Sequence, residues 1–285
     1  MPTFETQKSN RLWWEQNPMI YDWHATLHST PGTRRWFEEI DGRFIASAYY
    51  AVGKDRLPFS RFLEPKSFSG KRVLEAGCGM GTHAAMLARA GACLTAIDIT
   101  AGAVAMTKRR FEVFGLTGQI EQADCEDLPF SNDTFDAVWS WGVIHHSTST
   151  ERCLEEITRV LKPGGRILLM VYYKRSIVYY VHCGLLRGIL LGQLASRTLQ
   201  EIYAAASDGF YARVFTKKEL RALLETHYSQ IKLTVVGLKA ELLPIPACRL
   251  KENIVGLILD RFASAILGRW GSMIVIAAQK KIDPK

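Results

Sequence analysis

The feature that most constrains this chain is an apolar run that ends in closely spaced glycines, VLEAGCGMGTH, over residues 73–83. Such a run is typical of a buried strand that turns directly into a helix in an open α/β sheet. Gly77, Gly79 and Gly81 let the backbone turn sharply and approach a ligand without a Cβ in the way. The sequence therefore predicts a ligand site at the carboxyl end of this strand.

The charge beside the glycines bears on which ligand the loop can hold. Phosphate-binding loops place an anion at a helix N-terminus, where backbone N–H groups and the helix dipole favour it, and Glu75 would repel that anion. S-adenosylmethionine carries a sulfonium and an ammonium and no phosphate, so a carboxylate suits it. The spacing also differs from the dinucleotide pattern G-x-G-x-x-G. The loop favours S-adenosylmethionine, and the alternative is a tight turn without a ligand.

Later segments predict further polar residues at strand ends. LTAIDIT ends a strand at Asp98, whose carboxylate can accept from both hydroxyls of a ribose. A helix is expected over 103–115 and a short strand over 119–124, where Asp124 can accept from the exocyclic amine of adenine. FDAVWSWGVIHHS predicts a fourth strand with 140–142 at its carboxyl edge, which is where ligands bind in open α/β sheets.

The order and spacing of VLEAGCGMGTH, AIDIT, ADCEDLPF, FDAVWSWGVIHH and VLKPGGRILLM, over about residues 70–173, carry a family resemblance. The chain resembles the class I S-adenosylmethionine-dependent methyltransferases, in particular the ubiquinone/menaquinone- and sterol-type branch. The resemblance implies a Rossmann-like, doubly wound α/β sheet of seven strands, mostly parallel with the last strand antiparallel. It does not carry the methyl acceptor, because fold and cofactor are shared across many substrates.

The resemblance also implies which residues bind the cofactor. Glu75 and the glycine loop would line its methionyl part, Asp98 its ribose and Asp124 its adenine, while Ser140 and Trp141 would close the pocket beside the methyl group. The full implied set is Glu75, Gly77, Cys78, Gly79, Gly81, Asp98, Ile99, Asp124, Cys125, Ser140 and Trp141.

Methyl transfer to a hydroxyl or to an activated carbon also requires that a proton be removed. The predicted catalytic candidates are His145 and His146, at the edge of the fourth strand, and Tyr21 in the N-terminal segment. The histidine pair suits a role in shaping the pocket at least as well. His24 and His28 are competing candidates for the base.

The sequence divides into four segments. Residues 1–69 form an aromatic cap, 70–173 the cofactor-binding core, 174–213 a lid insertion, and 214–285 complete the sheet with a helical insertion. The cap either folds over the cofactor and excludes water or simply packs on the sheet. The insertion approaches transmembrane length, but His, Arg and Gly interrupt it, so a helical lid over an apolar pocket is expected, with a position on a membrane surface as the alternative.

Local patterns locate the C-terminal elements. Thr216 and Glu219 predict a capping box at a helix start. Strands are expected over 231–238 and 272–279. A helix inside 252–270 is expected to pack on something apolar, where it either helps to roof the site or forms a dimer contact. The apolar residues at helical spacing that support this helix are Ile254, Ile258, Phe262 and Ile266.

Composition agrees with one compact enzyme. A chain of 285 residues with 48% hydrophobic content can bury a full core in one elaborated domain. Its six cysteines are scattered without C-x-x-C or zinc spacing, which argues against a disulfide framework or a metal site and favours a reducing cytoplasm. The first residues contain no apolar signal region, which argues against secretion.

The positive charge is concentrated in the last part of the chain. Residues 174–285 hold 17 basic and 8 acidic side chains, whereas 71–173 hold 10 and 12. Such a region attracts an acidic substrate or an anionic membrane surface, and the alternative is a solvated basic face. Because the basic residues are dispersed and no nucleic-acid module is recognisable, nucleic acid is not an expected partner.

Together these patterns predict a cytoplasmic methyltransferase that uses S-adenosylmethionine to methylate a small or lipid-like acceptor, with O- or C-methylation favoured. Peripheral contact with the inner face of a membrane and a homodimer stay open. The alternative within the class is S- or N-methylation of a small nucleophile. The alternative from another class is a non-catalytic cofactor-binding module that recruits a partner or a membrane.

Overall fold

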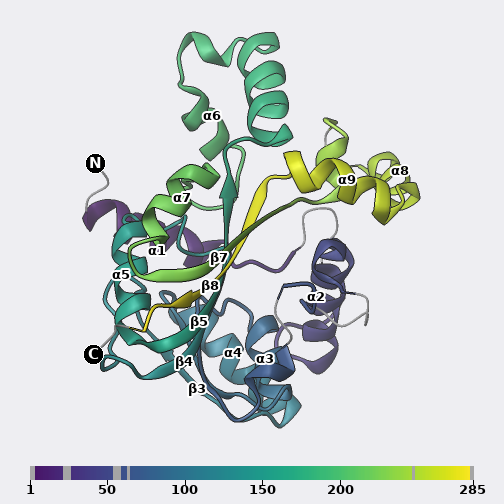
Figure 1. Ribbon diagram of the computed structural model, residues 1–285. Coiled ribbons are helices and arrows are strands. Elements are labelled where there is room, and N and C mark those ends of the chain that lie inside the picture. The colour runs from purple at the N-terminus through teal and green to yellow at the C-terminus, as the bar shows by residue number, and fades with distance from the viewer. Residues whose placement is uncertain (1–3, 22–26, 54–58, 63–64, 246–247, 283–285) are drawn as a thin grey trace.

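The computed structural model describes residues 4–21, 27–53, 59–62, 65–245 and 248–282. Figure 1 shows a twisted central sheet with helices on both faces and two helical extensions beyond one end of the strands.

The sheet has the strand order β3-β2-β1-β4-β5-β8-β7, with β6 paired to β5. Neighbours from β3 to β6 run parallel, and β8 runs antiparallel to both β5 and β7. The predicted Rossmann-like sheet with an antiparallel last strand is therefore confirmed, and its eighth strand is the two-residue β6. The strands are β1 (Arg72–Ala76), β2 (Cys93–Asp98), β3 (Gln119–Gln122), β4 (Phe135–Trp141), β5 (Leu161–Tyr173), β6 (Val214–Phe215), β7 (Tyr228–Val236) and β8 (Met273–Lys280).

Helices precede, connect and extend the strands. The α-helices are α1 (Phe4–Gln16), α2 (Arg34–Ser47), α3 (Thr82–Arg89), α4 (Ala101–Phe114), α5 (Thr150–Val160), α6 (Leu199–Ala204), α7 (Lys217–Leu224), α8 (Arg249–Leu257) and α9 (Asp260–Trp270). The shorter or irregular helices are η1 (Tyr49–Ala51), η2 (Pro65–Phe68), the π-type helix η3 (Val178–Leu190), η4 (Gln193–Ala195) and η5 (Lys239–Leu242).

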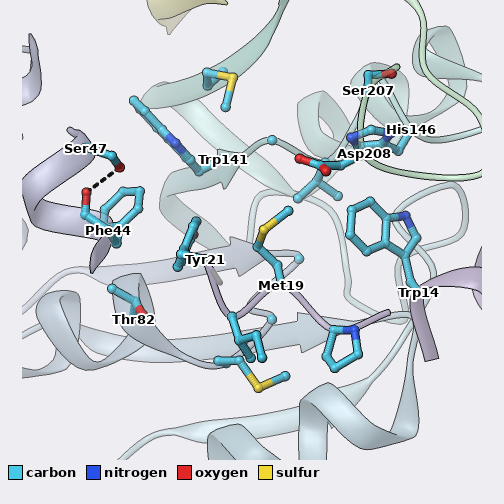
Figure 2. A pocket seen from close by; sticks show the side chains of 18 of the residues that line it. Trp14, Met19, Tyr21, Phe44, Ser47, Thr82, Trp141, His146, Ser207 and Asp208 are labelled. Carbon is cyan, nitrogen blue, oxygen red and sulfur yellow. Dashed lines mark hydrogen bonds between the residues drawn. The ribbon is translucent and has the colours of Figure 1, made fainter. Parts of the chain in front are cut away.

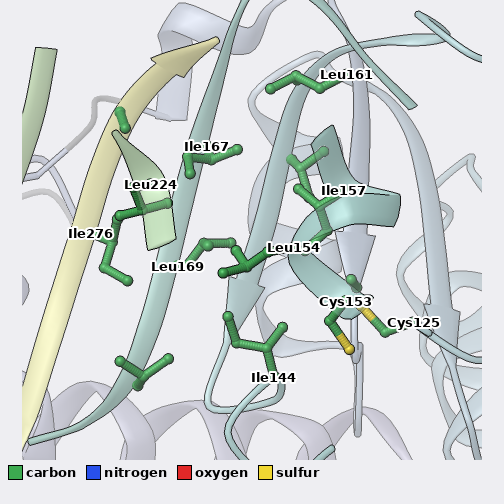
Figure 3. Packing of buried hydrophobic residues seen from close by; sticks show 14 of the residues in the cluster. Cys125, Ile144, Cys153, Leu154, Ile157, Leu161, Ile167, Leu169, Leu224 and Ile276 are labelled. Carbon is green, nitrogen blue, oxygen red and sulfur yellow. The ribbon is translucent and has the colours of Figure 1, made fainter. Parts of the chain in front are cut away.

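Apolar side chains bury both faces of the sheet. Successive residues of a strand point to opposite faces, so Leu74 joins one core cluster and Val73 the other. On the first face, Leu154 and Ile157 of α5 pack over Leu169 of β5 (Figure 3). Each fully buried side chain of this size contributes about 1.5–3 kcal/mol. Burial on both faces explains the continuous apolar runs that mark these strands in the sequence.

Side-chain caps fix where the helices begin. Thr100 accepts a hydrogen bond from the backbone N–H of Ala103 at the start of α4, and the helix ends at Gly115 in the left-handed conformation (φ 62°). At α7, Thr216 and Glu219 form the predicted capping box, with both reciprocal bonds present. The cap at Thr100 holds the start of α4 beside the end of β2, where the ligand site was expected.

The prediction of one helix inside 252–270 was wrong. The chain forms α8 and α9, which are separated at Ile258 and Leu259 in extended conformation. The expected apolar stripe is also not the buried face, because Phe262 is 59% exposed while Ala263 and Leu267 are buried. A break in the helix changes the phase of the pattern, so a stripe drawn through both halves joins residues that do not share a face.

The segment between β5 and β6 is helical. Tyr179 and Cys183 of η3 pack against Ile202 and Tyr203 of α6 in a small core of their own. In the part of the chain that the structure describes, no helix is both long and apolar enough to cross a membrane.

Candidate functional site

A cavity of about 1230 Å³ lies along the carboxyl ends of β1, β2 and β4. Its lining comes from the glycine loop, from the ends of these strands and from residues of α1, η3, α6 and α8. Figure 2 shows Trp14 of α1 and Trp141 of β4 among the side chains around it. Pockets for one small ligand usually measure roughly 300–1,000 Å³. The cavity therefore has room for two ligands side by side.

The glycine loop forms the floor of the cavity and depends on the absence of side chains. Gly77 has a φ of +84°, and a Cβ at this position would collide with Val143. The backbone N–H groups of Gly77 and Cys78 donate to the carbonyl of Ile97, at 2.8 and 2.9 Å. These bonds hold the loop against the end of β2, so a ligand can approach the backbone closely.

Asp98 connects the glycine loop to the start of α4. Its Oδ2 accepts from the N–H of Gly79 (2.9 Å), and its Oδ1 accepts from the N–H and hydroxyl of Thr100 (3.0 and 2.8 Å). Burial raises the pKa of this carboxyl, and the three hydrogen bonds oppose that rise. The carboxylate is thereby held in one orientation at the cavity wall.

Glu75 is a buried acid at the cavity floor whose Oε2 has no hydrogen-bond partner among the described residues. Burial and the nearby charge of Asp98 raise its pKa well above the usual range. His83 lies 4.0 Å away but supplies no positive charge, because its Nδ1 accepts from Trp139 Nε1 (3.0 Å) and burial lowers its pKa to about 3. A cationic ligand would give Glu75 a partner, so this site fits S-adenosylmethionine and not a phosphate.

Asp124 is already engaged by the N-terminal helix. Both of its carboxylate oxygens accept from Gln7 Nε2, at 3.1 and 3.0 Å. Asn10 donates to the carbonyl of His146 (2.8 Å), and Glu15 accepts from the first backbone N–H groups of α4 (3.0 and 2.8 Å). Helix α1 therefore spans the rim of the cavity.

These α1 contacts were missed at the level of the sequence. Gln7, Asn10 and Trp14 lie at positions i, i+3 and i+7, which share one face of a helix. That spacing was a usable signal for a helix that binds through polar groups. The aromatic residues of the same segment predict an apolar cap instead.

The structure brings most of the predicted site residues to the cavity. Three of them do not line it: Gly81, Ser140 and His145. Gly81 is the N-cap of α3, and Ser140 is fully buried. His145 is enclosed by His146 and Tyr172, whose ring centroids lie 4.1 and 4.0 Å from its own. Those that line the cavity are Tyr21, Glu75, Gly77, Cys78, Gly79, Asp98, Ile99, Asp124, Cys125, Trp141 and His146.

The aromatic cap contributes to the cavity only in part. Tyr21 lines it and packs on Phe44 with ring centroids 5.0 Å apart; burial raises the pKa of Tyr21, so its phenol keeps its proton at neutral pH. His28 is exposed, with its backbone N–H bonded to a carboxylate of α2. The candidate His24 lies outside the described part of the chain.

His146 has a defined tautomer. Its Nδ1 lies 2.7 Å from the carbonyl oxygen of Tyr211. A carbonyl can only accept, so Nδ1 carries the proton and Nε2 carries the lone pair. Burial lowers the pKa of His146 to about 4, which makes it a neutral but weak base at pH 7.

Asp208 is an acidic residue of the cavity that the sequence did not single out. Its loop packs on His146, since a Cβ at Gly209 would collide with that ring. Burial raises the pKa of Asp208, and its charge contributes to the raised pKa of Tyr172. Figure 2 shows Asp208 on the same side of the cavity as His146 and Trp14. In the sequence, SDG marks only a turn, so nothing pointed to the cavity.

Glu241 also lines the cavity, and its carboxyl group accepts hydrogen bonds from backbone and hydroxyl groups around it. Its Oε1 accepts from the N–H of Leu238 and the hydroxyl of Ser272, and its Oε2 accepts from the N–H of Ser272, at 2.6 to 2.9 Å. Burial raises its pKa from 4.5 to about 7. Because the folded state binds this proton more tightly than the unfolded state, the stabilisation from the protonated form is present below pH 4.5 and is lost as pH rises through 7.

Glu241→Gln should therefore change how stability depends on pH. From this one group we expect the free energy of unfolding of the native protein to fall by up to about 3 kcal/mol between pH 4.5 and 8. The variant should not show this fall. Its free energy of unfolding at pH 4.5 should be lower than that of the native protein, because a glutamine side chain cannot accept all three hydrogen bonds. Urea unfolding at several pH values measures both slopes, and parallel curves for the two proteins would contradict the assignment.

Part of this chain is similar to known proteins. Residues 74–169 match a family model described as a methyltransferase domain. A demethylmenaquinone methyltransferase from Clavibacter sepedonicus is 34% identical over 154 residues, which cover 51% of this chain and 60% of that protein. A fatty-acid O-methyltransferase from Mycolicibacterium smegmatis is 41% identical over 101 residues, covering 35% and 36%. The chain thus spans less than two thirds of these relatives.

A structural neighbour agrees in fold. The crystal structure of an S-adenosylmethionine-dependent methyltransferase from Mesorhizobium loti superposes with a TM-score of 0.53 at 16% identity. The match covers 77% of this chain and 94% of that chain. The likeness extends well beyond the segment matched by the family model.

Proposed function

We propose that this chain is a class I S-adenosylmethionine-dependent methyltransferase that transfers a methyl group from this cofactor to a small-molecule or lipid-like acceptor. The observation that carries the proposal is one continuous cavity of about 1230 Å³. The glycine loop lines part of it, and the lining extends to residues far from that loop in the sequence. The cofactor would occupy the end beside Glu75, Asp98 and Asp124. The remaining volume would receive the acceptor.

The lining of the remaining volume favours an apolar acceptor. Aromatic and thioether side chains gather where the acceptor would lie: Tyr50, Trp141, Met170, Tyr172, Tyr203 and Met273. Trp141 and Tyr50 stack with ring centroids 6.5 Å apart, so this part of the wall is aromatic. Flat aromatic walls suit rings and acyl chains. The two relatives are named for demethylmenaquinone and for a fatty acid, which supports this class of acceptor.

When bound, S-adenosylmethionine supplies an electrophilic methyl group that leaves its sulfur as the acceptor atom forms the new bond and gives up its proton. The residues of this chain would hold the two reactants in line, which supplies much of the rate. Glu75 would pair with the positive charge, Asp98 would accept from the ribose and Asp124 from the adenine. Gln7 already donates to both carboxylate oxygens of Asp124. Adenine would therefore have to bind beside the Gln7 amide or replace it.

We favour transfer to oxygen or carbon because the cavity offers a proton acceptor. Asp208 has a raised pKa, which brings a carboxyl closer to the value that suits a general base at neutral pH. His146 is the second candidate, with its lone pair on Nε2 and a pKa of about 4. Tyr21 would donate a hydrogen bond rather than accept a proton. His145 does not line the cavity and would support the ring of His146.

Two alternatives make different predictions. S- or N-methylation of a small nucleophile would not need Asp208, and a non-catalytic module would bind the cofactor without turnover. The first experiment is calorimetry of the folded chain with S-adenosylmethionine, S-adenosylhomocysteine and NADH. We expect both adenosyl ligands to bind and NADH not to bind.

An acceptor screen would follow, with formation of S-adenosylhomocysteine as the readout. Quinols, phenols and fatty acids should be methylated in preference to thiols and amines. Absence of adenosyl binding would overturn the cofactor assignment, a preference for thiols or amines would favour the first alternative, and binding without turnover would favour the second.

A further inference from the structure

Two exposed apolar surfaces project from the edge of the sheet that holds the cavity. They stand on insertions that follow β5 and β7, which run parallel because both are antiparallel to β8, so both leave from the same sheet edge (Figure 1). Leu191 is 71% exposed on one and Leu257 is 81% exposed on the other. The η3–η4 surface consists of Leu185, Ile189, Leu190, Leu191 and Leu194, and the α8–α9 surface of Leu250, Ile254, Leu257, Leu259 and Phe262.

Both insertions also line the cavity. The lining includes Val178 and His182 from η3 and Lys251 and Val255 from α8. A flat apolar layer that covered both surfaces would therefore lie against the helices that form this part of the cavity wall. Exposed apolar groups of this extent mark an interaction surface rather than ordinary solvent contact.

The charge of the two insertions indicates what covers them. Residues 178–198 and 248–270 together contain six basic and two acidic residues. One of the acids, Asp260, is paired with Lys239 at 2.7 Å. Leucine and isoleucine interleaved with arginine and lysine are the composition that binds anionic bilayer surfaces. A second copy of this chain on the same patch would instead bring like charges face to face.

We propose that the η3–η4 and α8–α9 surfaces dock together on an anionic lipid bilayer, with the mouth of the cavity facing the membrane. Their leucines enter the interface while the arginines and Lys251 lie at the level of the phosphates. Docking does not depend on methyl transfer. Entry of a lipid-like acceptor from the bilayer does rest on the proposed function.

Sedimentation of the full chain with vesicles tests the docking directly. We expect the protein to pellet with phosphatidylcholine vesicles that contain phosphatidylglycerol, and to do so much less with phosphatidylcholine alone. Added salt should reduce the bound fraction, because the attraction of the basic residues is screened.

Matched variants locate the surface. Leu191→Asp and Leu257→Asp should each lower the vesicle partition coefficient by about tenfold or more, since a charge replaces an inserted apolar group. Ile282→Asp is the control, because Ile282 is also 71% exposed but lies near the C-terminus, away from both surfaces. Calorimetry with S-adenosylmethionine checks that each variant is folded, and it tests the proposed function separately.

Three outcomes would overturn the docking proposal. The first is a wild-type chain that does not pellet with anionic vesicles at low salt. The second is an equal loss of binding for Ile282→Asp and Leu191→Asp. The third is a dimer, seen by light scattering, that Leu191→Asp converts to a monomer without any vesicle binding, which would assign the surfaces to a second copy of the chain.

Discussion

Replacing Asp208 with asparagine should lower kcat about 10²- to 10⁴-fold and leave the Kd for S-adenosylmethionine unchanged. Asparagine keeps the size and one acceptor oxygen of the side chain but cannot take up a proton. Asp208 lines the cavity on a loop packed against His146, and it is not one of the residues expected to bind the cofactor. Single-turnover rates with an acceptor that the native protein methylates measure the loss in methyl transfer. Calorimetry with S-adenosylmethionine measures cofactor binding separately.

The pH dependence of kcat identifies which group takes the proton. Burial raises the pKa of Asp208, so a base at this position becomes active as pH rises through that raised value. Burial lowers the pKa of His146 to about 4, so a base there would be active over the whole range above pH 5. We expect an acidic limb in the profile of the wild-type protein that Asp208→Asn removes.

Ser207→Ala provides the control for this site, because its side chain lines the same cavity beside Asp208 and does not titrate. It should keep both the rate and the acidic limb. If Asp208→Asn stays fully active while His146→Gln is inactive with intact cofactor binding, His146 is the base. If both variants stay active, neither residue is a required proton acceptor. The better proposals are then O-methylation of an acceptor that is already deprotonated, such as a fatty-acid carboxylate, or S- or N-methylation.

The parts that the sequence predicts well are those where one local pattern has one structural solution. Apolar strands buried on both faces and left-handed glycines leave few alternatives, so the strand-to-helix turn at Gly77 follows from the motif itself. The mostly parallel sheet with an antiparallel last strand follows from the family resemblance that the motifs carry. The capping box of Thr216 and Glu219 is equally local, because its partners lie within one turn.

The parts that the sequence misses depend on contacts between distant segments. The pairing of Gln7 with Asp124 joins residues 117 positions apart, and neither residue type identifies the other. Asp208 enters the cavity only because an insertion folds back on His146. The apolar residues of α8 and α9 fit one buried stripe in the sequence. In the structure the helix breaks at Ile258, and Phe262 is exposed. Periodicity indicates which residues share a helix face, but it does not indicate whether that face contacts protein or solvent.

Asp98→Ala should weaken binding of S-adenosylmethionine by about 1.5–3 kcal/mol, or about ten- to 150-fold in Kd. The variant removes the carboxylate expected to accept from the ribose, and it frees the N–H of Gly79 and the hydroxyl of Thr100. Calorimetry with S-adenosylmethionine and S-adenosylhomocysteine should give similar losses for both, because the two ligands share the ribose. Asp136→Ala is the matched control: this carboxylate also accepts a backbone N–H, from Arg72 at 2.8 Å, but lies at the start of β4 at the opposite sheet edge.

A loss of affinity in Asp98→Ala could come from the ribose contact or from a loosened glycine loop, and a ligand without ribose hydroxyls separates the two. For a 2′,3′-dideoxy analogue of S-adenosylhomocysteine, the native carboxylate has no hydroxyl to accept from, so the penalty of Asp98→Ala should shrink to the part that reflects the loop. An equal penalty for both ligands would mean that Asp98 acts only by holding Gly79 and Thr100 in place. An unchanged Kd in a folded variant would remove Asp98 from the site altogether, because a buried carboxylate that contacts the ligand cannot be deleted without cost.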